Sequence, residues 1–229
     1  MLIGGWQKIT LIDYPGMVST TIFTVGCNLR CPFCHNPELV LPELIKKLSL
    51  ISAEEFFNYL KERQGLIEGV CITGGEPTLQ ADLADFLAAI KKLGFKIKLD
   101  TNGTQPEKIK TLMSQKLVDY WALDIKEPLE RKEIYPEPFK IKESIELIKN
   151  SGLDYEFRTT VYPRLSADDI LKIVSEIKPA KRYYLQEFSR KKILDSTLTA
   201  EPALDRKALI EIWQKIKENF EICEIRYNA

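Results

Sequence analysis

Three cysteines lie within eight residues in the first part of the sequence. They are Cys27, Cys31 and Cys34, and they follow the order C-x3-C-x2-C inside the run GCNLRCPFCHN. Three thiolates on one short loop can each bind a different iron of a cubane cluster, which leaves the fourth iron without a protein ligand. An iron with an open position can bind a substrate, as an open zinc position does. The spacing therefore indicates a metal site that can accept a further ligand.

Two simpler interpretations of this loop remain open. One is a structural zinc ion bound by the three cysteines together with His35, although Cys34 and His35 are adjacent and would have to face the same ion. The other is a set of small buried apolar side chains. The remaining cysteines, Cys71 and Cys223, are expected to be packing residues. An odd total of five cysteines is a poor disulfide framework and favours a reducing compartment, so we expect a cytoplasmic protein.

The composition is typical of a globular protein. The chain has 229 residues, of which 45% are hydrophobic and 29% are charged. Lys and Arg together number 33, as do Asp and Glu, so the formal net charge is zero. This balance argues against a nucleic-acid partner, which needs a clustered cationic excess. The sequence lacks an 18-residue apolar run, so we expect no membrane-spanning helix, and its start lacks the pattern of a secretory signal.

Predicted strands alternate with predicted helices along the chain. Such alternation requires crossover connections and hence a parallel sheet with helices outside it. About six such units are too few for a closed barrel of eight strands. We therefore predict an α/β fold, a partial, open parallel β/α barrel in a single domain, residues 1–229. Its expected parts are an N-terminal hairpin or lid (1–17), a barrel core (18–188), and a C-terminal helix and strand (189–229). The strands are expected at 18–25, 70–73, 95–99, 118–123, 155–161, 182–185 and 222–225, and the helices at 52–64, 82–93, 106–115, 139–150, 167–177 and 202–220.

Polar or glycine residues lie at the ends of most of the predicted strands. Ligands of parallel α/β sheets bind at the carboxyl ends of the strands. Two adjacent glycines allow close backbone approach, and the carboxylate after them can face an ammonium group. A turn or a surface ion pair is the simpler interpretation of each segment. The segments are Gly74-Gly75-Glu76, Asp100-Thr101-Asn102 and Asp124-Ile125-Lys126, with Arg158 on a later strand and Gln186 near another strand end.

The cysteine loop resembles the hallmark of the radical S-adenosylmethionine (SAM) superfamily, C-x3-C-x-aromatic-C, with Phe33 at the aromatic position. The resemblance implies that Cys27, Cys31 and Cys34 bind one [4Fe–4S] cluster and that SAM chelates its unique iron. It also implies that Phe33 lies near the adenine of SAM. The full set of expected cofactor-binding residues is Phe33, Cys34, His35, Gly74, Gly75, Glu76, Asp100, Asp124, Ile125, Lys126, Arg158 and Gln186.

The later motifs resemble those of glycyl-radical-enzyme activases in particular. The GGEP motif corresponds to one that binds the SAM amino group, and Asp100 is expected to meet the same group. Asp124 and Lys126 are expected to line the cofactor site. The resemblance also assigns a monovalent cation to the positions of Asp100, Thr101 and Asp124. One departure is Gln186, which stands where a branch of this family has a histidine.

The N-terminal run GWQKITLIDYPG, followed by GCNLRCPFCHNPEL, resembles the anaerobic ribonucleoside-triphosphate reductase activating proteins. That resemblance implies an enzyme that reductively cleaves SAM and generates a glycyl radical on a partner enzyme. It further implies a one-electron donor such as flavodoxin or ferredoxin. Two alternatives are a small-molecule radical SAM enzyme similar to 7-carboxy-7-deazaguanine synthase, and a non-catalytic binding module stabilised by zinc.

Overall fold

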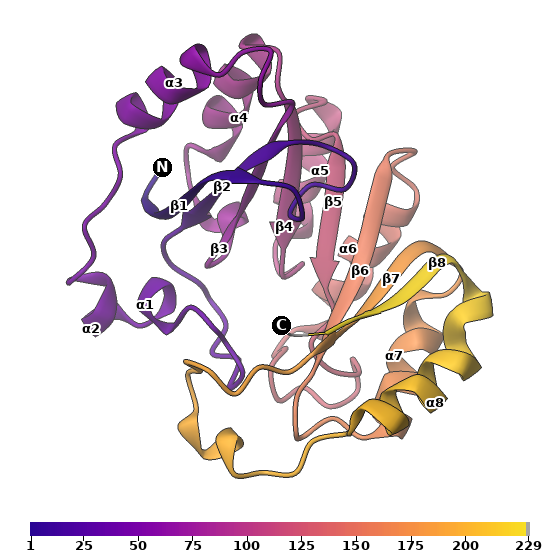
Figure 1. Ribbon diagram of the computed structural model, residues 1–229. Helices are drawn as coiled ribbons and strands as arrows, with labels where there is room; N and C mark the ends of the chain where they lie inside the picture. Colours follow the sequence, from indigo (N-terminus) through magenta and orange to yellow (C-terminus); the bar gives the residue numbers. More distant parts are fainter. Residues whose placement is uncertain (228–229) are drawn as a thin grey trace. The chain divides into compact units, whose positions relative to one another are not determined.

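The structure is a computed structural model that describes residues 1–227. Within these residues, eight strands follow one another in chain order in one sheet, and helices alternate with them (Figure 1). The alternation confirms the predicted α/β class. The strands are β1 (Ile3–Thr10), β2 (Ser19–Thr24), β3 (Gly69–Gly74), β4 (Lys96–Thr101), β5 (Tyr120–Asp124), β6 (Asp154–Val161), β7 (Ala180–Glu187) and β8 (Phe220–Arg226). The α-helices are α1 (Pro37–Val40), α2 (Pro42–Ile45), α3 (Ala53–Glu62), α4 (Leu83–Lys92), α5 (Pro106–Ser114), α6 (Pro138–Lys149), α7 (Ala167–Ile177) and α8 (Arg206–Ile216), and the short 3-10 helices are η1 (Pro77–Leu79), η2 (Ser196–Thr199) and η3 (Lys217–Asn219).

The chain groups into two compact units. The first unit consists of Met1–Asn28, Asn36–Thr101 and Glu107–Trp121. The second unit consists of Leu29–His35, Asn102–Pro106 and the chain from Ala122 onward. The division passes through the cysteine loop, because Cys27 belongs to the first unit whereas Cys31 and Cys34 belong to the second.

The sheet of the first unit combines one antiparallel pair with parallel pairs. β1 pairs antiparallel with β2, and β2–β3 and β3–β4 pair parallel. β-branched and apolar residues dominate β2 and β3, which suits strands buried on both faces. Ile22 and Ile72, opposite each other in the parallel register, are fully buried. The helix α3 begins as predicted, since the Ser52 side chain accepts a hydrogen bond from the Glu55 amide at 3.0 Å.

In the second unit, β6, β7 and β8 form parallel pairs. The helix between β6 and β7 is α7, and it spans the predicted range, residues 167–177. Its N-terminus is a capping box, in which Ser166 and Asp169 exchange side-chain-to-backbone hydrogen bonds. The apolar face of α7 is buried at Ile170, Ile173, Val174 and Ile177, so this helix covers part of the core.

Two predicted boundaries were wrong, and two short helices were not predicted. β4 continues through Thr101, so Asp100 and Thr101 lie on the strand and not in the loop after it. The C-terminal helix begins only at Arg206, because the Asp205 side chain accepts the Ala208 amide at 2.8 Å and caps it there. The short helices α1 and α2 were not predicted; each has a proline at its first position, where the missing amide costs no hydrogen bond.

No helix in residues 1–227 combines the length and the apolar character that crossing a membrane requires.

One ion-pair cluster of the first unit predicts a pH effect on stability. The Asp119 carboxylate accepts hydrogen bonds from the Lys91 ammonium at 2.7 Å and the Ile97 amide at 2.8 Å. Burial acts to raise the pKa of Asp119, but these bonds and the nearby lysines outweigh it and hold the pKa below its ordinary value of 3.8. The ionised carboxylate therefore stabilises the fold above about pH 4, and this contribution disappears as the pH falls through the lowered pKa.

We expect Asp119→Asn to reduce the free energy of unfolding at pH 7. The deficit should shrink steadily below pH 4, where the parent carboxylate also becomes neutral. Urea unfolding between pH 7 and pH 3 measures both chains. If the difference in unfolding free energy between the two proteins does not change with pH, the effect comes from altered packing and not from the charge of Asp119.

Candidate functional site

The glycines after β3 bring the backbone against the residue that precedes Cys27. The amide of Gly75 donates to the Thr24 carbonyl at 2.9 Å, and the amide of Glu76 donates to the Gly26 carbonyl at 2.8 Å. A Cβ atom on Gly75 would lie only 2.1 Å from the Gly26 carbonyl oxygen. Only glycine fits this approach. The GGEP segment therefore fixes where the cysteine loop starts within the first unit.

Glu76 is fully buried, and its carboxylate holds its own neighbourhood together. One carboxylate oxygen accepts hydrogen bonds from the Thr78 amide at 3.1 Å, the Thr78 hydroxyl at 2.5 Å and the Thr101 hydroxyl at 2.7 Å. These bonds cap η1 and connect the end of β3 to β4. The contact of Glu76 with an ammonium group stays a prediction, whereas its structural role is visible here.

Asp100 on β4 is buried beside a lysine that sequence reasoning missed. The Lys98 ammonium lies 2.5 Å from the Asp100 carboxylate, and the Cys71 sulfur lies 3.8 Å from the same carboxylate oxygen. The Lys98 side chain is only 2% exposed. Residues two apart on a strand share a face. This alternation was the sequence signal that could have placed Lys98 beside Asp100. The first unit therefore contains a buried Lys98–Asp100 ion pair next to a buried thiol.

In the second unit, three predicted residues come together. The Arg158 guanidinium on β6 lies 2.7 Å from one oxygen of the Asp124 carboxylate at the end of β5. The Lys126 ammonium lies 3.5 Å from the other oxygen. The Ile125 amide donates to the Arg158 carbonyl at 2.8 Å, which fixes the segment after β5. Asp124, Lys126 and Arg158 thus present one negative and two positive groups at one strand end.

Two residues that sequence reasoning missed hold this segment in place. The Tyr135 hydroxyl donates to the Asp124 carbonyl at 2.7 Å and accepts the Lys126 amide at 3.1 Å. Burial raises the pKa of Tyr135, which keeps its phenol protonated as a donor. The carboxylate of Glu127 accepts the amides of Ile134 and Tyr135 at 2.6 and 2.9 Å. Both residues lie in a loop without a recognisable pattern, so no sequence signal pointed to them.

Phe33 is buried and packs against aromatic and cationic neighbours. Its ring centroid lies 4.5 Å from that of Tyr162, at an interplanar angle of 31°. Burial raises the pKa of Tyr162 to about 12. The Lys126 ammonium lies 6.0 Å from the Phe33 ring. Phe33 is therefore fixed in the same unit as the Asp124 cluster.

Two further predicted residues of the second unit are His35 and Gln186. His35 has its Nδ1 atom 3.4 Å from the Lys191 carbonyl and its ring 6.3 Å from that of Phe188. Gln186 lies on β7, opposite Thr160 in the parallel register with β6. Neither position by itself tests a contact with SAM.

The Arg158 cluster includes a further carboxylate that is almost completely buried. Glu156 is 1% exposed and pairs with Arg158 and Arg226, each at 3.4 Å. Breaking a buried pair by removing one partner leaves an uncompensated charge. We expect Arg158→Gln to lower the free energy of unfolding by about 3 kcal/mol.

Urea unfolding of single and double variants measures this coupling. Arg158→Gln leaves the buried Glu156 carboxylate with one arginine in place of two, and Glu156→Gln removes that carboxylate, so the double variant should lose less stability than the sum of the two single variants. Arg206→Gln, which breaks an exposed pair with Glu187, is the matched control and should barely move the midpoint. If the loss of unfolding free energy in the double variant equals the sum of the losses in the single variants, Arg158 and Glu156 are energetically independent.

The cysteine donors fit the chemistry of an iron–sulfur cluster. All five cysteines are thiols, and the Cys34 amide donates to the Cys31 carbonyl at 3.0 Å, which places these two cysteines on one tight turn. Soft thiolates are the ligands that iron–sulfur clusters use. Residues 1–227 contain no preassembled group of three or more His, Cys, Asp or Glu ligands. Metal binding by Cys27, Cys31 and Cys34 therefore rests on the donor types and their spacing.

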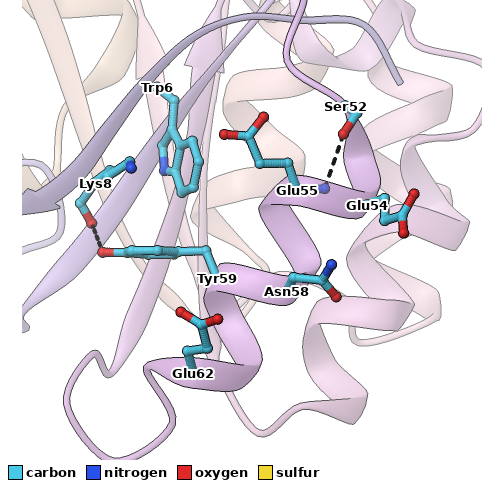
Figure 2. Close-up of a pocket in the computed structure, with 8 residues that line it drawn as sticks. All are labelled: Trp6, Lys8, Ser52, Glu54, Glu55, Asn58, Tyr59 and Glu62. Carbon is cyan, nitrogen blue, oxygen red and sulfur yellow. Dashed lines mark hydrogen bonds between the residues drawn. The ribbon is translucent and has the colours of Figure 1, made fainter.

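A pocket of about 440 Å³ lies in the first unit, beside β1 and α3, and contains none of the predicted site residues. Figure 2 shows the rings of Trp6 and Tyr59 next to each other, together with the carboxylates of Glu54, Glu55 and Glu62 from α3. The two rings meet edge to face with centroids 4.8 Å apart, and the Tyr59 hydroxyl donates to the Lys8 carbonyl at 2.7 Å. These contacts pack α3 against β1. The carboxylates are exposed, and no further observation points to a ligand.

Comparisons with known proteins place this chain in a family. The sequence profile of the Radical SAM superfamily matches residues 21–177. A Methanocaldococcus jannaschii protein named as a glycyl-radical enzyme activating enzyme (MJ1227) is 33% identical over 98% of this chain and 95% of its own length. The pyruvate formate-lyase-activating enzyme of Clostridium pasteurianum is 30% identical over 75% and 74% of the two chains. The 7-carboxy-7-deazaguanine synthase of Archaeoglobus fulgidus is 32% identical over 72% of each.

The fold is shared with solved structures. Streptococcus suis SuiB bound to S-adenosylmethionine aligns with 91% of this chain at a TM-score of 0.64 and 17% identity, and this chain spans about half (52%) of the SuiB chain. This likeness bears out the expected fold, an open, mostly parallel β/α arrangement. The family profile covers well over half of the chain, and the M. jannaschii relative covers nearly all of it. The chain is an enzyme that belongs to the radical SAM superfamily.

Proposed function

We propose that this protein reductively cleaves SAM at a [4Fe–4S] cluster and generates a glycyl radical on a partner enzyme, an anaerobic ribonucleoside-triphosphate reductase. The observation that carries the proposal is the C-x3-C-x2-C loop in a chain that resembles an activating enzyme over nearly its full length. The N-terminal GWQKITLIDYPG run supports the particular partner. A flavodoxin or a ferredoxin is the proposed one-electron donor.

In this proposal, Cys27, Cys31 and Cys34 bind the cluster, which supplies one electron to the sulfonium of SAM. The protein supplies orientation and a dry site. The fixed backbone at Gly26 and the turn from Cys31 to Cys34 support this role, because both limit the directions in which the thiols can point. Homolytic cleavage needs no general acid or base, which suits a chain with one histidine.

SAM carries an ammonium, a carboxylate and a sulfonium, and it needs counter-charges of both signs. The cluster of Asp124, Lys126 and Arg158 offers them, and the buried Phe33 offers an apolar surface for adenine. Gly74, Gly75, Glu76 and Asp100 are the proposed contacts of the amino group. Asp100, Thr101 and Asp124 are also the proposed ligands of a monovalent cation, and His35, Ile125 and Gln186 are the remaining proposed cofactor contacts.

Electron paramagnetic resonance spectroscopy tests the proposed function. Anaerobically reconstituted protein, reduced and mixed with SAM and a candidate reductase, should give a glycyl radical doublet on the reductase. A reductase in which alanine replaces the radical-forming glycine is the control and should give no such signal.

Other outcomes would support the alternatives. If a pterin and not a protein accelerates SAM cleavage, the 7-carboxy-7-deazaguanine synthase-like alternative is favoured; a relative of that activity is 32% identical to this chain. A colourless protein that binds one zinc ion tightly would instead indicate the binding module.

A further inference from the structure

The segment between β7 and α8 is hydrogen-bonded to the cysteine loop within the second unit. The Leu194 amide donates to the Cys34 carbonyl at 3.0 Å, and the Asp195 amide donates to the Pro32 carbonyl at 2.9 Å. The His35 Nδ1 atom lies 3.4 Å from the Lys191 carbonyl. We call residues 188–201 the strap. The strap backbone thus fixes the carbonyl groups of Pro32 and Cys34 in the cysteine loop.

The strap has internal contacts that give it a defined shape. The Arg190 guanidinium donates to the carbonyls of Leu198, Thr199 and Glu201. The Leu198 side chain is completely buried, and the Asp195 carboxylate accepts the Thr197 amide at 3.0 Å, which caps η2. A compact loop closed by its own side chains is a preformed element and not a loose connection.

Arg164 joins the strap to the loop that follows β6. Its guanidinium lies 3.2 Å from the Asp195 carboxylate and 2.7 Å from the Glu201 carboxylate. Asp195 is the residue whose amide bonds to Pro32, so Arg164 acts at the point where the strap meets the cysteine loop. Exposed ion pairs are weak and sensitive to salt. The side-chain contacts between Arg164 and the strap are therefore weak and sensitive to salt.

We propose that the strap holds residues 31–35 in their ligand-binding conformation and that Arg164 is the positioning residue that keeps the strap closed. The inference rests on the proposed function in one respect, since the ligand retained by Cys31 and Cys34 is the iron of the cluster. Groups that orient metal ligands from outside commonly change metal retention when they are mutated. The strap orients the ligand loop through two backbone hydrogen bonds, so its loss should weaken iron retention.

The test compares Arg164→Gln with Arg206→Gln, which breaks another exposed arginine–carboxylate pair of the same unit. Hydrogen exchange on the protein without iron should show faster exchange of the Leu194 and Asp195 amides, by about tenfold, in Arg164→Gln alone. Iron release from the reconstituted protein to a ferrous chelator should also accelerate about tenfold. Arg164→Lys should partly restore the slow amide exchange and the slow iron release. Raised salt should accelerate both in the unsubstituted protein, because it weakens the ion pairs of Arg164.

Each outcome decides something about the strap. Equal exchange and equal iron release in Arg164→Gln and Arg206→Gln would overturn the proposal. Faster exchange without faster iron release would also overturn it, because the strap would then open without affecting the ligands. A protein that takes up no iron would contradict the proposed function, while the exchange measurement would still show whether Arg164 closes the strap.

Discussion

Replacing Cys31 with alanine is expected to abolish cluster binding and reductive SAM cleavage. A cubane held by three thiolates would lose one of its three protein attachments, and Cys34, three residues further on, cannot bind two irons at once. We expect the iron content after anaerobic reconstitution to fall to background and the brown absorbance to disappear. Iron and sulfide analysis with the visible spectrum measures this. Full retention of iron in Cys31→Ala would contradict the assignment of the ligands.

Cys223→Ala is the matched control for this variant. Cys223 lies on β8, and burial raises the pKa of its thiol to about 12. Thiolates bind iron and thiols bind it poorly, so a cysteine with this pKa is a weak ligand at neutral pH. Cys223→Ala should therefore keep its iron and its SAM cleavage. Equal losses in the two variants would point to general misfolding.

Gly75→Ala should have the second largest effect, through the backbone. The added Cβ would lie 2.1 Å from the Gly26 carbonyl oxygen and 2.7 Å from the Gly26 carbonyl carbon, so one of the two segments must move. Overpacking of this kind costs about 3 kcal/mol of unfolding free energy. The amide of Glu76 would also lose its hydrogen bond to Gly26. Because Gly26 precedes Cys27, we expect poor cluster loading as well as a lower urea midpoint.

Gly65→Ala is the control for Gly75→Ala, because it changes a glycine without creating a steric clash. Gly65 has a φ angle of +81°, but an added Cβ would meet no atom within 4 Å. An alanine there should cost about 1 kcal/mol, from its left-handed conformation alone. A similar loss of stability in both variants would show that the contact between Gly75 and Gly26 carries no special strain.

Local patterns in the sequence were sufficient for most of the fold. A β-branched run gave β2 its position, apolar spacing gave α4 its range to within one residue at each end, and Ser52 marked the start of α3. The resemblance of the cysteine loop to a known family identified the superfamily, which the family profile confirmed. These features depend on residues close together in the chain, where propensity and periodicity act.

Most of the missed features depend on residues that are far apart in the chain. Lys98 and Asp100 are two residues apart on β4, but the burial of their ion pair beside Cys71 of β3 is visible only in the fold. The carboxylate of Glu76 accepts a hydroxyl from β4, and this partner could not be deduced from the GGEP motif alone. The C-terminal segment had no assigned role, yet Leu194 and Asp195 bond to the cysteine loop. Each of these contacts arises only when strand ends and loops meet in three dimensions.

Relatives that are named for different activities resemble this chain to a similar degree, so overall similarity does not identify its substrate. An activating enzyme and a 7-carboxy-7-deazaguanine synthase both match most of this chain at similar identity. A shared fold positions a cofactor but does not select what the resulting radical attacks. The substrate therefore has to be identified by experiment on the loaded protein.

Reductive cleavage of SAM tests the central claim most directly, because it requires both three thiolate ligands and an iron that SAM can reach. Protein purified and reconstituted without oxygen should contain about four irons per chain. After reduction, it should convert SAM to methionine and 5′-deoxyadenosine, quantified by chromatography. Protein that contains the iron and sulfide but leaves SAM intact, or that takes up neither under any loading condition, would contradict the account.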